Sequence, residues 1–105
     1  MLIVYVKHYL TPDGIDYLEK SWFQSVHSIL KQQEGFISIT YTIKGDCVDI
    51  TLKFEDEKTF DAWCEIPEHN TLIDELNPYR SRDYFEAVRT DNEHADPLTL
   101  EWEIY

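Results

Sequence analysis

Apolar residues follow two different periods along this sequence, and the change from one to the other marks the predicted strands and helices. Residues 2–9 are almost continuously β-branched, aromatic or aliphatic, which is typical of a strand buried on both faces. A long helix is predicted next, because Thr11 suits the N-cap, Pro12 the first helical position and Gly35 the end. Its apolar stripe recurs at steps of three and four residues: Ile15, Leu18, Trp22, Val26 and Ile29.

A hairpin is predicted after this helix. Residues 37–43 and 48–54 each alternate apolar and polar side chains, and Gly45-Asp46 between them is a typical turn. Both strands therefore have one apolar face, which predicts that they line a common core.

The second half begins with another helical region, predicted over residues 56–76. Pro67 interrupts it, because proline cannot donate to the helical hydrogen-bond ladder, so two short helices are expected to meet there. Two further strands are predicted, over residues 83–90 and 98–105. In the last one Leu98, Leu100, Trp102 and Ile104 alternate with polar residues.

The predicted order, β-α-β-β-α-β plus a terminal strand, indicates an α+β fold of the ferredoxin-like, split βαβ type, with helices on one face of an antiparallel sheet. The other face would mix Thr, Ser and Lys with aliphatic and aromatic side chains. Such a face is a liability when bare, so we expect a second copy to cover it, sheet against sheet, in a homodimeric α/β barrel. We assign residues 1–90 to this domain, and residues 91–105 to an acidic loop and a strand that extends either its own sheet or its partner's.

The charge of the chain excludes several kinds of partner. Its 105 residues carry 21 acidic and 9 basic side chains, a formal charge of -12, and fifteen of the acidic groups lie in residues 54–105. A protein this acidic is repelled by phosphate backbones and anionic lipids, so we expect no nucleic acid and no membrane as partner. Cys47 and Cys64 have neither redox nor zinc spacing, which predicts free thiols in a reducing cytoplasm.

The candidate site lies around Trp63, His69 and Asn70. Pro67 begins a helix in which His69 shares an apolar stripe with Leu72 and Leu76, six residues after the tryptophan. The helix N-terminus and burial both disfavour a positive charge, so we expect a neutral imidazole that can transfer a proton. The alternative is structural: a histidine bonded to backbone, a core tryptophan and a capping or solvated asparagine.

These residues also carry a resemblance. The element order, with Phe60-x-x-Trp63, Pro67-x-His69, an apolar run and Pro78-Tyr79, resembles the antibiotic-biosynthesis monooxygenase superfamily of dimeric α+β barrels over about residues 1–90. That superfamily includes oxygenases without a cofactor, haem-degrading enzymes and stress or signalling proteins. The resemblance implies a pocket between sheet and helices with Trp63 and His69 beside it.

The resemblance implies a cofactor-independent monooxygenase acting on a small electron-rich aromatic or quinol-type substrate. In it His69 would move the proton, Asn70 would stabilise an oxyanion and Trp63 would exclude water. The alternative is a non-catalytic dimer that binds a small apolar or aromatic ligand, or a stress-related protein. The haem-degrading branch has an asparagine late in the first strand, where this chain has Val6-Lys7-His8, so no haem is expected.

His8 and His27 have no spacing partners, and we expect them to lie at the surface or at a strand end. Arg80 and Arg82 form a close basic pair that we expect to neutralise neighbouring acids, with the alternative that the pair holds an acidic substrate. The segment 91–96 lacks the glycine and the spacing of a calcium loop, so no metal is expected there.

Overall fold

The computed structural model describes all 105 residues, and its five strands form one antiparallel sheet in the order β2-β3-β1-β4-β5. β1 (Leu2–Tyr9) lies at the centre between β3 (Cys47–Phe54) and β4 (Glu86–Thr90). β2 (Phe36–Lys44) and β5 (Glu103–Ile104) form the two edges. The central strand is the one with the most continuous apolar sequence, as expected for a strand flanked on both sides.

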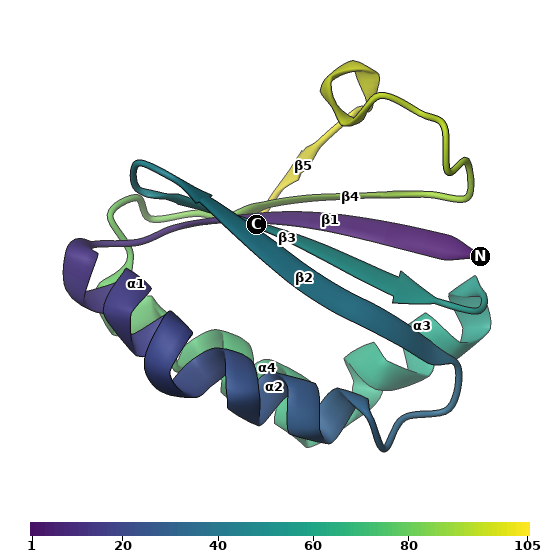
Figure 1. The fold of residues 1–105 in the computed structure, drawn as a ribbon, viewed down its shortest axis with the longest axis horizontal. Coiled ribbons are helices and arrows are strands. Elements are labelled where there is room, and N and C mark those ends of the chain that lie inside the picture. The colour runs from purple at the N-terminus through teal and green to yellow at the C-terminus, as the bar shows by residue number, and fades with distance from the viewer.

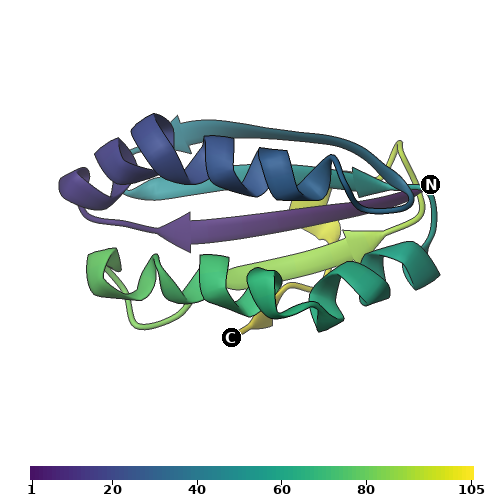
Figure 2. The same cartoon turned by 90° about the horizontal axis from the view of Figure 1, so that it is seen from below.

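All the long helices lie on one face of this sheet (Figure 1). The first helical segment is α1 (Pro12–Tyr17), a π-helical turn η1 (Leu18–Trp22) and α2 (Phe23–Leu30). The second helical segment is α3 (Glu57–Glu65) and α4 (Pro67–Asp74), and the two segments lie side by side in one layer beneath the sheet (Figure 2). The α+β, ferredoxin-like fold predicted from the sequence is confirmed.

The first helical segment starts where the sequence predicted and ends earlier than the predicted stop at Gly35. Thr11 caps it, accepting a hydrogen bond from the backbone N–H of Gly14 at 3.2 Å. Regular helix stops at Leu30, five residues before Gly35. Gly35 instead adopts a φ of +82° in the loop, and a side chain there would collide with Thr59 of α3. This glycine therefore allows the loop to approach the second helical segment closely.

The second helical region matches its predicted pattern. Asp56 caps α3, because its carboxylate accepts from the backbone N–H of Thr59 at 2.8 Å, and this hydrogen bond lowers the pKa of Asp56. The backbone turns into an extended conformation at Ile66, and Pro67 opens α4. The predicted break at Pro67 is confirmed.

The core lies between the sheet and the two helical segments. Strand β3 alternates strictly, with Val48, Ile50, Leu52 and Phe54 buried and the residues between them half-buried. On β1 the same helix-facing side carries Leu2, Val4, Val6 and His8. Trp22 of the first helical segment and Trp63 of the second both pack into this core.

Two strand boundaries in the second half were predicted wrongly. β4 begins at Glu86 rather than at residue 83, and residues 98–105 are mostly not strand. Asp96 accepts a hydrogen bond from the backbone N–H of Leu98 at 3.0 Å and starts a 3-10 turn, η3 (Pro97–Thr99). This local turn outweighs the period-two pattern, so only Glu103–Ile104 pairs with β4, extending the chain's own sheet.

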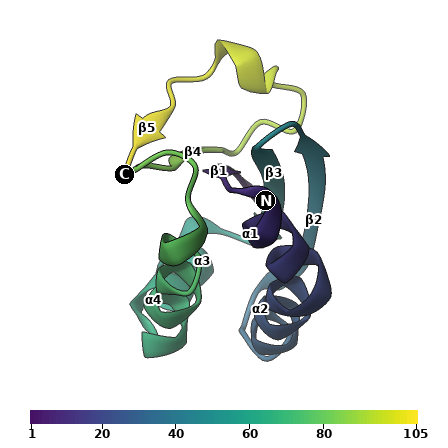
Figure 3. The ribbon, with the colours of Figure 1, turned by 90° about the vertical axis from the view of Figure 1, so that its left-hand side faces the viewer.

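Residues 91–105 form an arm above the sheet face that has no helices (Figures 1 and 3). Trp102 contacts that face: its ring centroid lies 6.4 Å from that of Tyr5, and Lys7 Nζ lies 4.5 Å above the indole. Leu98 and Ile104 of the same arm are 83% and 69% exposed. The predicted alternation therefore does not bury these two side chains within one chain. None of the helices has the length and apolar character needed to cross a bilayer.

Candidate functional site

A cavity of about 630 Å³ lies between the sheet and the two helical segments. Seventeen of its 24 lining residues are hydrophobic, which makes it suited to an apolar or aromatic molecule. The walls include Val4, Val6 and Ile50 from the sheet, and Trp22, Phe60 and Leu72 from the helices. The cavity is therefore placed where the sequence led us to expect a pocket.

Trp63, His69 and Asn70 all line this one cavity. The Trp63 side chain is buried, and its ring meets the His69 ring edge to face, with centroids 5.3 Å apart and planes at 90°. His69 Nδ1 lies 3.1 Å from the Asn70 side-chain oxygen. If Nδ1 donates this hydrogen bond, Nε2 carries the free lone pair that a general base needs.

His69 is more exposed than the sequence predicted, whereas the exposure of Asn70 agrees with the alternative of a capping or solvated asparagine. His69 is half-buried and Asn70 is exposed, whereas Leu72 and Leu76 of the same stripe are buried. The first turn of α4 thus lies at the edge of the cavity rather than inside the core. The Asn70 side chain is bonded to His69, which favours a role in orienting the imidazole over direct contact with an inner oxyanion.

Trp22 links the two helical segments through a hydrogen bond. Its indole N–H donates to the Leu72 carbonyl at 2.7 Å. That carbonyl is in the last turn of α4, where helical carbonyls lack backbone partners, because the N–H groups of Glu75 and Leu76 bond to other residues. Trp22, part of the apolar stripe predicted for this helix, is thus a buried core residue that also borders the cavity.

His8 contradicts the expectation of a surface or strand-end residue. Only 3% of it is exposed, it lines the cavity, and its ring packs between Trp22 and Phe85. The reason is its register on β1: it follows Leu2, Val4 and Val6 on the side that faces the helices. Burial, and secondarily the charge of Arg80, lower the pKa of His8 from 6.5 to about 3.

Arg80 also contradicts its prediction, since it has no acidic partner at ion-pair distance. Its Nη1 lies 3.1 Å from His8 Nδ1, its Nε donates to the Asn77 side-chain oxygen at 2.9 Å, and its Nη2 is buried without a partner. The guanidinium also lies 5.0 Å from the Phe85 ring. Arg82 behaves as predicted, pairing with Asp46 at 3.7 Å.

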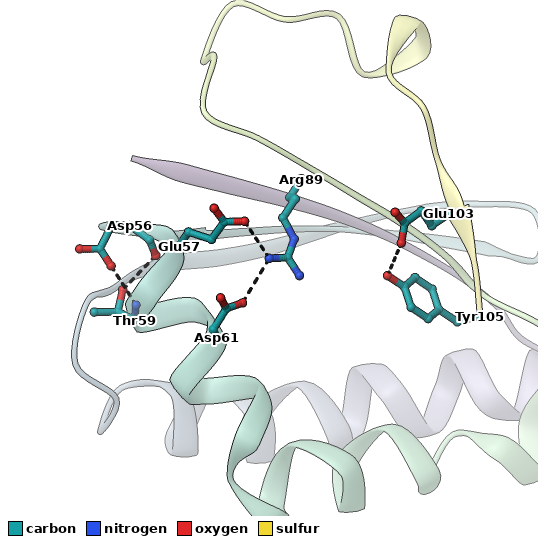
Figure 4. Close-up of polar contacts among 7 residues, drawn as sticks. All are labelled: Asp56, Glu57, Thr59, Asp61, Arg89, Glu103 and Tyr105. Carbon is teal, nitrogen blue, oxygen red and sulfur yellow. Dashed lines mark hydrogen bonds and ion pairs between the residues drawn. The ribbon is translucent and has the colours of Figure 1, made fainter.

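The mouth of the cavity is charged. Arg89, on β4, lies within 3.1 Å of Glu57 and 3.2 Å of Asp61, both on α3 (Figure 4). Glu101, Glu103 and Tyr105 of the C-terminal arm are also among the lining residues, and the Tyr105 hydroxyl donates to Glu103 at 2.8 Å. The opening is thus framed by α3, β4 and the arm, with more acidic than basic groups.

The cysteines and the acidic loop contribute no second reactive centre. Both Cys47 and Cys64 are free, as predicted. Cys64 lines the cavity, but burial raises the pKa of its thiol, which keeps it protonated and a weak nucleophile. Three or more His, Cys, Asp or Glu side chains do not gather anywhere in a way that could hold a metal ion.

Several solved structures share this fold. A crystal structure of an antibiotic biosynthesis monooxygenase is 16% identical over 88% of this chain and 98% of its own, with a TM-score of 0.74. A monooxygenase from the gene ActVA-Orf6 of Streptomyces coelicolor, in complex with the ligand nanaomycin D, is 20% identical over 90% of this chain and 89% of its own, with a TM-score of 0.76. SnoaB, a cofactor-independent oxygenase from Streptomyces nogalater, is 13% identical over 91% and 96%, with a TM-score of 0.74.

The sequence by itself matches no protein-family model and no curated protein. The likeness is therefore one of architecture, and at identities of 13–20% it establishes the fold. The architecture that the family resemblance implied is therefore confirmed.

Proposed function

We propose that this protein is a monooxygenase that oxidises a small electron-rich aromatic substrate, of phenol or quinol type, without a bound cofactor. The observation that carries the proposal is the mainly apolar cavity of about 630 Å³ with His69 and Trp63 side by side on its wall. The names of the structural neighbours, which include a monooxygenase and a cofactor-independent oxygenase, point the same way.

The proposed reaction starts with a proton transfer. His69 Nε2 accepts the proton of an aromatic hydroxyl, and Asn70 holds the imidazole by its Nδ1–H. The phenolate then passes one electron to O₂, and the two radicals combine to form a carbon–oxygen bond at a ring carbon that bears hydrogen. The resulting peroxide anion takes the proton back from His69 to form a hydroperoxide. The hydroperoxide then loses water as its O–O bond and that C–H bond break, which leaves a carbonyl. A phenol and O₂ thus give a quinone and H₂O.

The walls of the cavity serve this chemistry by keeping water out. Trp63 is buried and forms a rigid aromatic surface against which a flat ring can stack. A dry environment strengthens the electrostatic interactions on which the phenolate depends. The protein's contribution is then to orient the substrate, remove one proton and protect the reactive intermediate.

The test is oxygen uptake with a panel of quinols and polyphenols. General-base catalysis typically contributes about 100-fold or more, so His69→Ala should lower the rate by at least that factor. His94→Ala, in the exposed acidic loop, is the matched control and should leave the rate unchanged. Equal rates for wild type and His69→Ala would remove His69 from the mechanism. Tight binding of the same compounds with no oxygen uptake would instead support the non-catalytic ligand-binding alternative.

We also propose that the protein is a homodimer paired through the sheet faces that carry no helices. The support is the arm above that face, in which Leu98 and Ile104 are both largely exposed, since exposed large apolar side chains favour association. Sedimentation should give twice the 12.5 kDa chain mass, and Leu98→Asp should shift the equilibrium toward monomer. A wild-type protein that sediments as a monomer would refute the pairing.

We further propose that the protein is located in the cytoplasm, as its two free cysteines suggest.

A further inference from the structure

His8 is the only polar or charged residue in the buried core, and it lies on the cavity wall rather than within solid packing. Neither its burial nor its contacts are explained by the proposed proton transfer at His69. A buried imidazole is costly unless it is hydrogen-bonded, so its two ring nitrogens must be accounted for.

The contact with Arg80 fixes which nitrogen carries the proton. A guanidinium has only hydrogen-bond donors, so at the 3.1 Å contact Arg80 Nη1 donates and His8 Nδ1 accepts. Burial and the charge of Arg80 both lower the pKa of His8, to about 3, so the ring is neutral near pH 7. The single ring proton is therefore on Nε2.

The Nε2–H group has no partner within the protein. His8 makes one side-chain hydrogen bond, in which its Nδ1 accepts from Arg80. Arg80 Nη2 is the only fully buried polar side-chain atom that lacks a hydrogen-bond partner, so His8 Nε2 is not fully buried. Nε2 must therefore reach open space. Since His8 borders the cavity, this space is the cavity. The cavity thus has one preformed donor on an otherwise apolar part of its wall.

The charge behind this donor is not neutralised. Arg80 has no carboxylate at ion-pair distance, and its neighbours are the Asn77 amide, the His8 ring and the Phe85 ring. Asp74 of α4 is the acidic group that acts on Arg80 from farther away, and Glu101 and Glu103 lie at the cavity mouth. A negative oxygen at Nε2 would accept a charge-assisted hydrogen bond with this cation behind it.

We propose that His8, positioned by Arg80, is the residue that binds a ring oxygen of the substrate in its anionic form, and that the substrate is therefore an aromatic carrying two conjugated oxygens. One oxygen loses its proton to His69, and the negative charge that spreads to the other is held by His8 Nε2–H. This inference rests on the proposed function for the first oxygen. Arg80 acts through His8, by fixing its tautomer and supplying charge.

The test uses 4-hydroxybenzaldehyde, which has two conjugated oxygens, does not need turnover, and changes its absorption spectrum when the phenol ionises. Its pKa when bound to the wild-type protein should fall by about one unit or more, which means that the phenolate binds about tenfold tighter than the phenol. His8→Phe and Arg80→Met should each abolish this shift. Arg82→Met is the matched control, because it removes a nearby cation that contacts Tyr9 and Asp46 instead of His8, and it should keep the shift.

Four results would overturn the inference: an unshifted pKa in the wild type, no binding to the wild type, a shift that persists in His8→Phe, or an equal loss in Arg82→Met. His8→Gln keeps a donor of similar reach and should retain part of the shift, which guards against a variant that fails to fold. Nitrogen-15 NMR of His8 should show Nε2 protonated and Nδ1 bare, and the opposite tautomer would also contradict us. Oxygen uptake without the pKa shift would refute only the role of His8, whereas the shift without uptake would refute only the monooxygenase activity.

Discussion

Acid should destabilise this protein through one residue in particular, His8. The pKa of this buried imidazole is about 3 in the folded chain and 6.5 when it is free in water, because burial penalises its charged form. The folded state therefore binds its proton only at low pH, while the unfolded chain binds it below about 6.5. The contribution of His8 to stability is complete above pH 6.5 and is lost as the pH falls toward 3.

The size of this loss follows from the distance between the two pKa values. Each pH unit between them costs about 1.4 kcal/mol, so at about pH 4.5, two units below the unfolded value, the loss is about 3 kcal/mol. This is a large part of the 5–15 kcal/mol that keeps a typical domain folded. Other acid-sensitive groups, such as the capping carboxylate of Asp56, add to the total loss.

The contribution of His8 is isolated by comparing wild type with His8→Gln, which cannot titrate. Urea unfolding followed by tryptophan fluorescence should be measured for both proteins at pH 7 and near pH 4.5. Loss of ring packing in the variant shifts its stability equally at both pH values, whereas the titration affects only the wild type. The wild type should lose about 3 kcal/mol more than the variant on acidification. Equal losses, within about 1 kcal/mol, would show that His8 is solvated and that its placement against Trp22 and Phe85 is wrong.

Three further substitutions test the packing of the helices and of the loop at Gly35. Phe60→Ala should lower the free energy of unfolding by about 3–5 kcal/mol, because the ring is only 6% exposed. Trp22→Phe should cost about 1–3 kcal/mol, because it leaves the Leu72 carbonyl buried without its donor. Gly35→Ala should destabilise by more than about 1 kcal/mol, because the residue has a positive φ and a methyl group would collide with Thr59. Chemical denaturation measures all three.

Each of these substitutions has a control. Phe60→Leu keeps most of the buried volume and should cost much less than the alanine variant. A loss well under 1 kcal/mol for Phe60→Ala would mean that α3 presents a different face to the core. Trp22→Phe with unchanged stability would show that water replaces the lost donor. Gly45→Ala has a φ of +61° but nothing within 4 Å, so a cost equal to that of Gly35→Ala would rule out the collision with Thr59.

The fold could be predicted from the sequence wherever side chains alternate with one clear period and a capping residue marks the start. β3 and the α3–α4 break at Pro67 are such cases, because burial of alternate residues and the chemistry of proline act locally. The prediction of the terminal strand is wrong because Asp96-Pro97 forms a turn whose hydrogen bonds are also local, and this turn outweighs the alternation in residues 98–105. The exposure of Leu98 is the visible consequence.

The candidate site was predicted in part for a related reason. Trp63, His69 and Asn70 are near one another in sequence, on either side of the short break at Ile66-Pro67, and so they reach one cavity. His8 and Arg80 are 72 residues apart, and no spacing rule connects them. The only signal was the two-residue period that places His8 with Leu2, Val4 and Val6. That signal was lost because the strand was expected to be buried on both faces, which left no face to assign.

The π-helical turn at Leu18–Trp22 has a consequence for how this chain can change length. The N–H of Phe23 bonds to the Leu18 carbonyl five residues back, so the turn holds one residue more than regular α-helix. Removing one residue here would let the turn close as regular α-helix, so the helix on either side would keep nearly the same rotational phase. A deletion in the regular helix of α1 would instead rotate the two parts by about 100° relative to each other. Gly14 would then leave its close contact with Tyr79, or Trp22 would leave Leu72. Loss of a single residue should accordingly be tolerated better at Leu18–Trp22 than in α1.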